Sequence, residues 1–292
     1  MRTYNSLANN DYDNGDQWRF GFNRRVYTSG GKLYRVDDDG LVREYAQNGA
    51  VYVSKAGPDT YDTLSWSSST GKWTWTDGST QVKEVYEQIG STGEFRLATV
   101  SDIDGTTVRL ELAYDTSNRL ASVKSGNGEY LYFDYVAGTS RVERVRKLST
   151  TANPLVTYTY DTAGRLYTVA VDLTPDDAGD SVKYTTTYEY TTATSLQLAS
   201  IYQDDRSRLT FTYYADGRIK TVTDKRGSDI SRVSTYTYDT VNGKTTVTDA
   251  DNQVTELLYY TSGTNENLLL KGVRLKTAGG AVLQSLDLEY NS

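Results

Sequence analysis

The 292-residue chain contains no cysteine and no histidine. Without cysteine there is no disulfide framework, thiol nucleophile or thiolate metal site, and without histidine the commonest general base and metal ligand are missing. Proline occurs only three times. No stretch approaches the roughly 18 apolar residues of a membrane span, and residues 1–6 lack the apolar core of a signal peptide. Of the hydrolytic sites, only carboxylate-based ones remain.

A surplus of basic charge is also missing. The chain has 31 basic and 38 acidic residues, a formal net charge of −7 and a sequence pI near 4.8. This argues against nucleic acid as the main partner, because phosphate neutralisation needs a basic surface. The local cluster of Arg141, Arg144, Arg146 and Lys147 is interpreted as a solvated strand face.

What the chain has in abundance is tyrosine. It contains 26 Tyr and 24 Gly, and its hydrophobic content is 37%. Aromatic and β-branched side chains suit a pleated, half-buried surface, and tyrosine buries a ring while its hydroxyl reaches a polar group. No segment shows a sustained helical period. The composition therefore predicts an all-β protein.

The stretch from Tyr158 to Val169 reads Y-T-Y-D-T-A-G-R-L-Y-T-V. Tyr158 and Tyr160 are two residues apart, so in a strand both side chains leave the same face. Asp161 and Gly164 then supply a carboxylate for backbone amides and a residue that accepts positive φ. The stretch predicts a β-hairpin, which would be marginal in water by itself.

This unit recurs at intervals of 20 to 30 residues. Stacked hairpins bury a continuous face that one hairpin cannot bury, and accumulated strand twist makes a long sheet curl. We therefore expect a twisted, curling antiparallel sheet that forms a spiral or a partial shell. The repeat residues are predicted to be Tyr114, Asp115, Arg119, Tyr160, Asp161, Gly164, Arg165, Tyr214, Gly217, Arg218, Tyr238, Asp239 and Gly243.

The motif Y-D-x-x-G-R-L-x-x-V resembles that of the YD-repeat, or Rhs, family, which includes bacterial polymorphic toxins, shell components of insecticidal toxin complexes and the teneurins. The resemblance covers about residues 60–292 and is most specific at 160–166 and 214–219. The segment from Gly15 to Gly21 is similar to the one that precedes the repeats in bacterial members. It implies a β-sheet strip that spirals into a hollow shell.

The resemblance also implies a function. The chain would be a non-catalytic section of a shell that encloses or presents a C-terminal toxin domain in a larger secreted or cell-surface protein. Its partners would be the rest of that larger chain or the enclosed toxin domain, with no nucleic acid and no membrane span. Because the sequence stops inside a repeat at residues 289–292, we interpret it as a fragment or truncated member. The alternative is a carbohydrate-binding or adhesion module.

Residues 1–57 are the least repeat-like and are expected to form an N-terminal aromatic strand or cap, followed by the repeat array over 58–292 as one continuous β-structure. Trp18, Phe20 and Phe22 alternate with polar or small residues, as in a strand with one aromatic face. Such a strand covers the open end of an array, or it is a platform for a sugar. The clearest local break is Gly57-Pro58-Asp59.

Two further alternatives concern the charged repeat residues. The segments 37–40, 102–105 and 249–252 place carboxylates near turns, either as turn chemistry or as weak calcium sites. The repeat arginines are expected to stack on tyrosines of the adjacent unit, worth roughly 0.5–1 kcal/mol each, or to form a sugar-binding face with them. We expect no cofactor and no enzyme activity.

Overall fold

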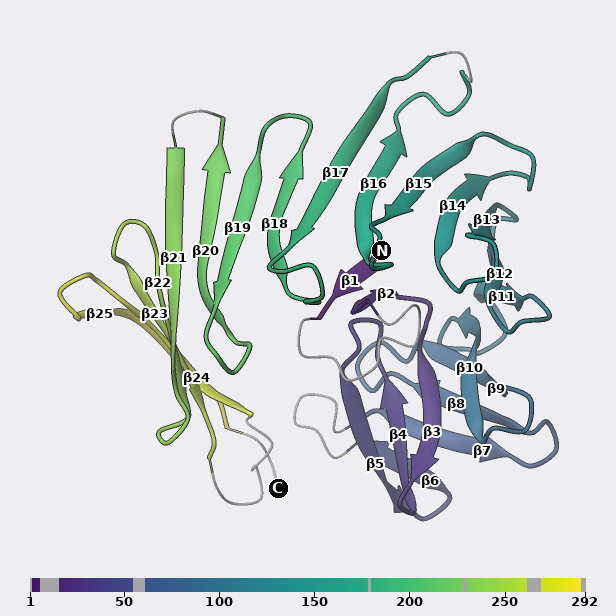
Figure 1. The fold of residues 1–292 in the computed structure, drawn as a ribbon. Coiled ribbons are helices and arrows are strands. Elements are labelled where there is room, and N and C mark those ends of the chain that lie inside the picture. Colours follow the sequence, from purple (N-terminus) through teal and green to yellow (C-terminus); the bar gives the residue numbers. More distant parts are fainter. Residues whose placement is uncertain are drawn as a thin grey trace. The chain divides into compact units, whose positions relative to one another are not determined.

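The computed structural model describes residues 2–5, 16–54, 61–177, 180–227, 230–261 and 269–289. Its residue contacts divide the chain into two compact units, Met1–Thr185 and Thr186–Ser292. We call these unit 1 and unit 2. Within the described ranges every regular element is a strand (Figure 1), which confirms the all-β prediction.

The strands of unit 1 are β1 (Arg2–Tyr4), β2 (Trp18–Phe20), β3 (Arg25–Ser29), β4 (Lys32–Val36), β5 (Val42–Asn48), β6 (Val51–Ser54), β7 (Thr63–Ser67), β8 (Lys72–Thr76), β9 (Lys83–Gln88), β10 (Glu94–Ser101), β11 (Val108–Tyr114), β12 (Leu120–Ser125), β13 (Tyr130–Tyr135), β14 (Val142–Lys147), β15 (Pro154–Tyr160) and β16 (Leu166–Asp172). The division between the units falls within β17 (Lys183–Tyr190). Unit 2 continues with β18 (Leu198–Gln203), β19 (Arg208–Tyr213), β20 (Ile219–Arg226), β21 (Ile230–Asp239), β22 (Lys244–Thr248), β23 (Val254–Tyr259), β24 (Leu270–Lys276) and β25 (Val282–Asp287).

The predicted hairpin at the centre of the sequence is present as β15 and β16, paired antiparallel from Val156↔Val171 to Tyr160↔Leu166. The register shifts between Thr159 and Tyr160, as it does where Tyr114, Tyr135, Tyr190, Tyr213 and Tyr259 end their strands. A bulge at the same place in each hairpin bends the strand and increases its twist. The sheet thus has a repeated local cause of curvature.

In unit 1 the curvature is sufficient to close part of the sheet. Strands β3 to β10 pair in sequence order, and β10 also pairs with β3 through Phe95↔Val26 and its neighbours, which closes a barrel (Figure 1). Its interior contains Val26, Leu64 and Tyr86, which are almost completely buried. Strands β11 to β16 continue from β10 as a sheet of antiparallel hairpins.

The short N-terminal pair β1–β2 packs on this continuation (Figure 1). The Phe20 ring makes edge contacts with Phe133 and Tyr158 at centroid distances of 5.6 and 5.8 Å. Asp16 Oδ2 accepts a hydrogen bond of 3.1 Å from the backbone N–H of Leu166. The predicted aromatic strand is therefore buried against the hairpins.

Unit 2 is a run of antiparallel hairpins from β17 to β25. Its side chains are less buried than those of unit 1, and all six residues of β25 are exposed. The predicted break at 57–59 and the chain's last residues 290–292 lie outside the described residues. The boundary between 57 and 58 stays a prediction.

Candidate functional site

The repeat residues build one type of turn. In it the amide of the first residue donates to the carbonyl of the fifth, the amide of the fourth donates to the carbonyl of the first, and the fourth residue has positive φ. The described part of the chain contains eight such turns, with first and fourth residues Asp37/Gly40, Asp115/Asn118, Ser125/Gly128, Asp161/Gly164, Gln203/Arg206, Tyr214/Gly217, Asp249/Asn252 and Thr277/Gly280.

Aspartate at the first position adds side-chain bonds to this frame. Asp161 Oδ1 accepts the backbone N–H groups of Ala163 (3.0 Å) and Arg165 (2.9 Å), and Oδ2 accepts Arg165 Nε at 2.7 Å. Asp115 and Arg119 repeat the arrangement at 2.9 and 2.8 Å. Each carboxylate thus bonds backbone amides and an arginine four residues later, so the pair fixes the turn.

The other two sequence copies use different chemistry. In the turn that begins at Tyr214, the carboxylate comes from Asp216, which accepts Arg218 Nε at 2.8 Å. In the turn that follows Tyr238, Asp239 accepts Asn242 through its backbone N–H (3.0 Å) and side-chain amide (2.7 Å). Gly243 there has a φ of 59° and follows directly in the turn.

The hairpins are connected by tyrosine hydroxyl groups. In each case the tyrosine at the end of the first strand of a hairpin donates a hydrogen bond to a backbone carbonyl of the preceding hairpin. The carbonyl belongs to the residue directly after the motif arginine, or after the residue that takes the place of the arginine. The pairs are Tyr114→Leu97 (2.6 Å), Tyr135→Leu120 (2.8 Å), Tyr160→Val142 (2.8 Å), Tyr213→Leu198 (2.8 Å) and Tyr238→Ile219 (2.9 Å). We call each of these bonds a tyrosine hook.

The same tyrosine rings carry an arginine from the preceding hairpin. Arg119 Cζ lies 4.3 Å from the Tyr135 ring centroid, and Arg218 Cζ lies 4.5 Å from that of Tyr238. The predicted stacking of repeat arginines on tyrosines of the adjacent unit is confirmed for these two. Arg96 over Tyr114 and Arg141 over Tyr160 are further cases, at 3.8 and 5.7 Å.

The fourth hook comes from Tyr213, one residue before the tyrosine that the sequence indicated. Tyr213 pairs with Ile219 at the bulge, as Tyr160 does with Leu166. Tyr214 instead occupies the position of Asp161, donates to the carbonyl of Tyr236 at 2.9 Å and packs against Tyr238. The doubled tyrosine concealed this offset, since either residue fits the sequence motif.

Replacing Tyr135 with phenylalanine is expected to lower the free energy of unfolding by about 1 kcal/mol, the usual net worth of one hydrogen bond. Only the hydroxyl that reaches the Leu120 carbonyl is lost. Tyr132→Phe is the matched control, because Tyr132 contributes a ring stacked on Tyr130. Urea titration of both variants measures the difference; equal loss would contradict the hook.

The turn carboxylates also make stability depend on pH. Burial raises the pKa of Asp161, but hydrogen bonds from the Arg165 side chain and backbone outweigh this and hold the pKa below 3.8. A carboxylate whose pKa is lower in the folded than in the unfolded protein stabilises the fold at a pH above its unfolded-state pKa. This stabilisation is lost as the pH falls through its folded-state pKa. We expect the melting temperature of Asp161→Asn to fall less than that of the unchanged protein between pH 4 and pH 2. Identical curves for the two proteins would refute this role.

The acidic turns are occupied by the chain itself. Asp104 accepts the backbone N–H groups of Thr106 and Thr107 at 2.8 and 3.0 Å, and Asp249 accepts those of Asp251 and Gln253. Within the described ranges, no group of three or more acidic residues is placed to hold a metal ion. The calcium alternative is tested by adding calcium, which should raise the melting temperature if such a site exists.

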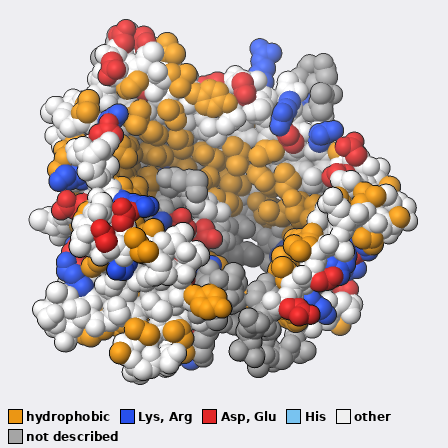
Figure 2. Space-filling model, turned by 180° about the vertical axis from the view of Figure 1, so that it is seen from behind, with side chains coloured by type: hydrophobic (Ala, Val, Ile, Leu, Met, Phe, Trp, Pro, Cys, Tyr) orange, Lys and Arg blue, Asp and Glu red, His pale blue; other side chains and the backbone are white. Residues whose placement is uncertain are grey.

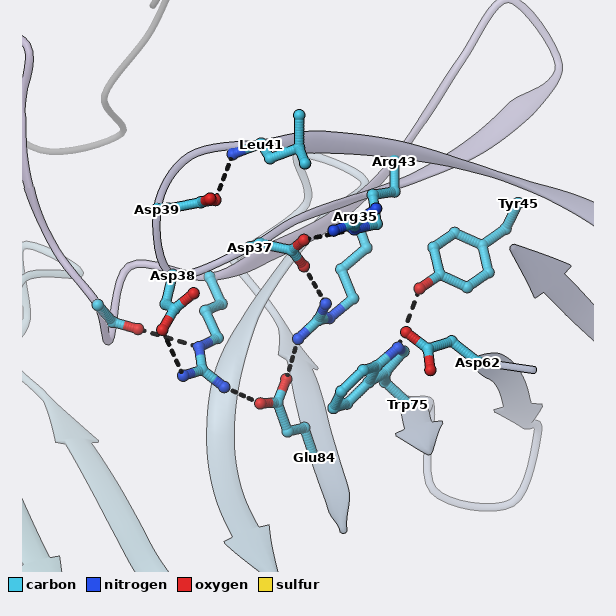
Figure 3. Close-up of polar contacts among 12 residues, drawn as sticks. Arg35, Asp37, Asp38, Asp39, Leu41, Arg43, Tyr45, Asp62, Trp75 and Glu84 are labelled. Carbon is cyan, nitrogen blue, oxygen red and sulfur yellow. Dashed lines mark hydrogen bonds and ion pairs between the residues drawn. The ribbon is translucent and has the colours of Figure 1, made fainter. Parts of the chain in front are cut away.

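A second polar cluster, which the sequence did not reveal, lies inside the barrel of unit 1 (Figure 3). Glu84, with 1% of its surface exposed, accepts hydrogen bonds from Arg24, from Tyr86 and from Arg35 Nη2, the last at 2.8 Å. Asp37 accepts from Arg35 and from Arg43 Nε, the latter at 2.6 Å. We call these residues the barrel network.

Aromatic groups complete the barrel network. The Arg35 guanidinium lies 3.7 Å from the Trp75 ring centroid, and Trp75 Nε1 donates to the Tyr45 hydroxyl at 2.9 Å. Burial lowers the pKa of Arg35, but Tyr86 and Asp37 raise it by more, so the guanidinium stays charged. Each carboxylate is engaged by two guanidinium groups, Glu84 by Arg24 and Arg35 and Asp37 by Arg35 and Arg43, so the network joins β4, β5 and β9.

The class of protein that this fold and these turns define is an antiparallel β-repeat protein whose hairpins are joined by tyrosine hooks. No family model matches the sequence, and no curated protein matches it. No helix that could span a membrane is found in the described ranges.

Solved structures are similar to the chain at low identity. The crystal structure of TcdB2-TccC3 without its hypervariable C-terminal region covers 91% of the chain at 13% identity with a TM-score of 0.43. That of TcdB2-TccC3-Cdc42 covers 91% at 14% identity with a TM-score of 0.40. The chain spans about 17% of the length of each of these proteins.

Proposed function

We propose that the chain is a non-catalytic section of the wall of a YD-repeat shell, which encloses or presents a C-terminal toxin domain in a larger secreted protein. The observation that carries the proposal is the recurrence of the tyrosine hook and arginine stack from one hairpin to the next. Because each contact joins a hairpin only to the neighbouring hairpin, a sheet built in this way can be extended by further hairpins.

The motif residues bind other residues of the chain through the tyrosine hooks, the arginine stacks and the bonds within the turns. Arg119 is bonded to Asp115, stacked on Tyr135 and donates to the Thr139 carbonyl at 2.7 Å. The Tyr135 hydroxyl is engaged by the Leu120 carbonyl. In a structural wall the motif residues bind residues of the neighbouring hairpins. A sugar-binding face instead needs aromatic ring faces and hydrogen-bond donors that are accessible to the sugar. This supports the shell over the carbohydrate-binding alternative.

Limited proteolysis of a longer protein tests the proposal. The chain is expressed within the larger protein that the proposal expects, and digestion of the C-terminal segment is followed by mass spectrometry. We expect that segment to be cleaved at least tenfold more slowly than the same segment made alone. Equal cleavage rates would overturn the shell proposal, and saturable binding on a glycan array would favour the adhesion alternative.

A further inference from the structure

Neutral polar side chains and backbone make up much of the surface seen in Figure 2. Among such groups, an asparagine followed by glycine is chemically unstable. The glycine amide nitrogen attacks the asparagine Cγ readily, because glycine has no Cβ that would shield that nitrogen. The sequence contains four such pairs, at 14–15, 48–49, 127–128 and 242–243. The first lies outside the described residues, so three can be compared.

The Asn48–Gly49 pair lies at the turn between β5 and β6, where Asn48 pairs with Val51. Both residues of the pair are exposed, and Gly49 has the positive φ, 61°, that such a two-residue turn requires. Within the described ranges neither the Asn48 carboxamide nor the Gly49 amide has a hydrogen-bond partner. A Cβ on Gly49 would meet nothing within 4 Å. The two reacting groups are therefore free to approach each other.

At the Asn127–Gly128 pair both reacting groups are engaged. The Gly128 amide donates to the Ser125 carbonyl at 2.9 Å. The Asn127 carboxamide accepts hydrogen bonds from the Ser125 hydroxyl and from the backbone N–H of Glu129, and it donates to the Glu129 carboxylate at 3.3 Å. Attack by the Gly128 nitrogen would break the hydrogen bond that closes this turn, so the fold slows the reaction here.

The Asn242–Gly243 pair is held and crowded. The Asp239 carboxylate accepts the Asn242 side-chain amide at 2.7 Å and its backbone N–H at 3.0 Å. Gly243 is buried, and its carbonyl accepts the Tyr259 N–H at 2.6 Å. A Cβ on Gly243 would lie 2.5 Å from Thr261 Cγ2. Ring closure would require the carboxamide to leave Asp239 in a place with little room.

We propose that Asn48 is a site of spontaneous deamidation in the folded protein. The Gly49 nitrogen attacks Asn48 Cγ and loses its proton while ammonia leaves, which closes a five-membered succinimide ring. Water then opens the ring at either carbonyl and gives aspartate or isoaspartate at position 48. A neutral amide is thus exchanged for a carboxylate, with water as the only co-reactant. The inference goes beyond the proposed shell function and does not depend on it.

The isoaspartate product lengthens the backbone at the turn by one carbon atom, since the chain then runs through the former side chain. The β5–β6 hairpin has a two-residue loop and a register that runs from Asn48↔Val51 to Tyr45↔Ser54. A two-residue loop fixes the register of its strands. Tyr45 is 2% exposed, and its hydroxyl accepts a hydrogen bond from Trp75. Conversion to isoaspartate therefore loosens this hairpin of the barrel.

Incubation of the intact chain in mildly alkaline buffer, followed by peptide mapping with mass spectrometry, tests the proposal. In the folded protein, conversion at Asn48 should be at least fivefold faster than at Asn127 or Asn242. In guanidinium chloride, where the same chemistry acts without the fold, the three rates should converge. Equal rates in the folded protein, or fastest conversion at Asn127 or Asn242, would overturn the proposal. So would a fivefold difference that persists in guanidinium chloride, because sequence alone would then explain it.

Two variants test the protection of the slower sites. Asp239→Ala removes the carboxylate that holds the Asn242 carboxamide, so conversion at Asn242 should accelerate at least threefold while the rate at Asn48 stays the same. Ser125→Ala removes the hydroxyl that donates to the Asn127 side chain and should accelerate conversion at Asn127. Unchanged rates in both variants would contradict the selection of Asn48 by hydrogen bonding.

The effect on the barrel is tested with Asn48→Gln, because glutamine would have to close a six-membered ring and does so far more slowly. After the same incubation, the unchanged protein should melt at a lower temperature than before. The incubated Asn48→Gln variant should keep its melting temperature. An equal fall in both proteins would show that position 48 is not the site that loosens the barrel.

Discussion

Gly164→Val is expected to lower the melting temperature more than Gly90→Val. Both glycines have positive φ, 84° and 52°, so valine pays about 1–3 kcal/mol of backbone strain at either site. The surroundings differ. A Cβ on Gly164 would lie 2.2 Å from Arg141 Nη2 and 2.6 Å from its Cζ, whereas a Cβ on Gly90 meets nothing within 4 Å.

Calorimetry of double variants can separate the effect of this clash from that of backbone strain. Arg141 stacks on Tyr160, so valine at 164 must displace the arginine that connects two hairpins. Arg141→Ala should therefore recover part of the loss in the double variant with Gly164→Val, and should recover none in a double variant with Gly90→Val. Equal melting temperatures for the two glycine variants would contradict the turn assignment.

Glu84→Gln is expected to remove about 3–5 kcal/mol from the free energy of unfolding, the cost of breaking a buried ion pair from one side. The substitution keeps the shape of the side chain but leaves Arg24 and Arg35 with one carboxylate fewer in the barrel network. Because Arg24 directly precedes β3 and Glu84 lies on β9, the closure of the barrel between β10 and β3 should loosen first.

Urea unfolding measures the loss, and Glu111→Gln is the control. Glu111 is 58% exposed in the side chain and lies 3.6 Å from Lys124, so its loss should stay within about 0.5 kcal/mol. Hydrogen exchange at Val26 and Phe95, which pair across the closure, should accelerate in Glu84→Gln alone. A loss similar to that of the control would show that the network contributes little.

The parts of the fold that depend on local chemistry were predictable. Asp161, Gly164 and Arg165 specify their turn through bonds that span at most four residues. The arginine stacks were also predictable, since a fixed offset in each repeat places neighbouring rows together. The Tyr213 offset was missed because sequence alone cannot choose between two adjacent tyrosines when the bulge decides which one reaches back.

The long-range features were not predictable. Closure of β10 on β3 joins residues about 70 positions apart in the sequence and rests on accumulated twist. Glu84 looks like any charged strand residue until Arg24 and Arg35 are brought to it from another part of the chain. The adjacent Val85 and Tyr86 are typical of a strand and carry no signal for a buried charge at Glu84.

A double-mutant cycle between Arg119 and Tyr135 tests most directly whether the motif couples one hairpin to the next. Arg119→Ala, Tyr135→Leu and the double variant are unfolded in urea, and their free energies are combined. The stack of Arg119 on Tyr135 predicts a coupling energy of about 0.5–1 kcal/mol. A coupling of zero, with both single variants as stable as the unchanged protein, would contradict the assignment of the repeat as a connector of hairpins.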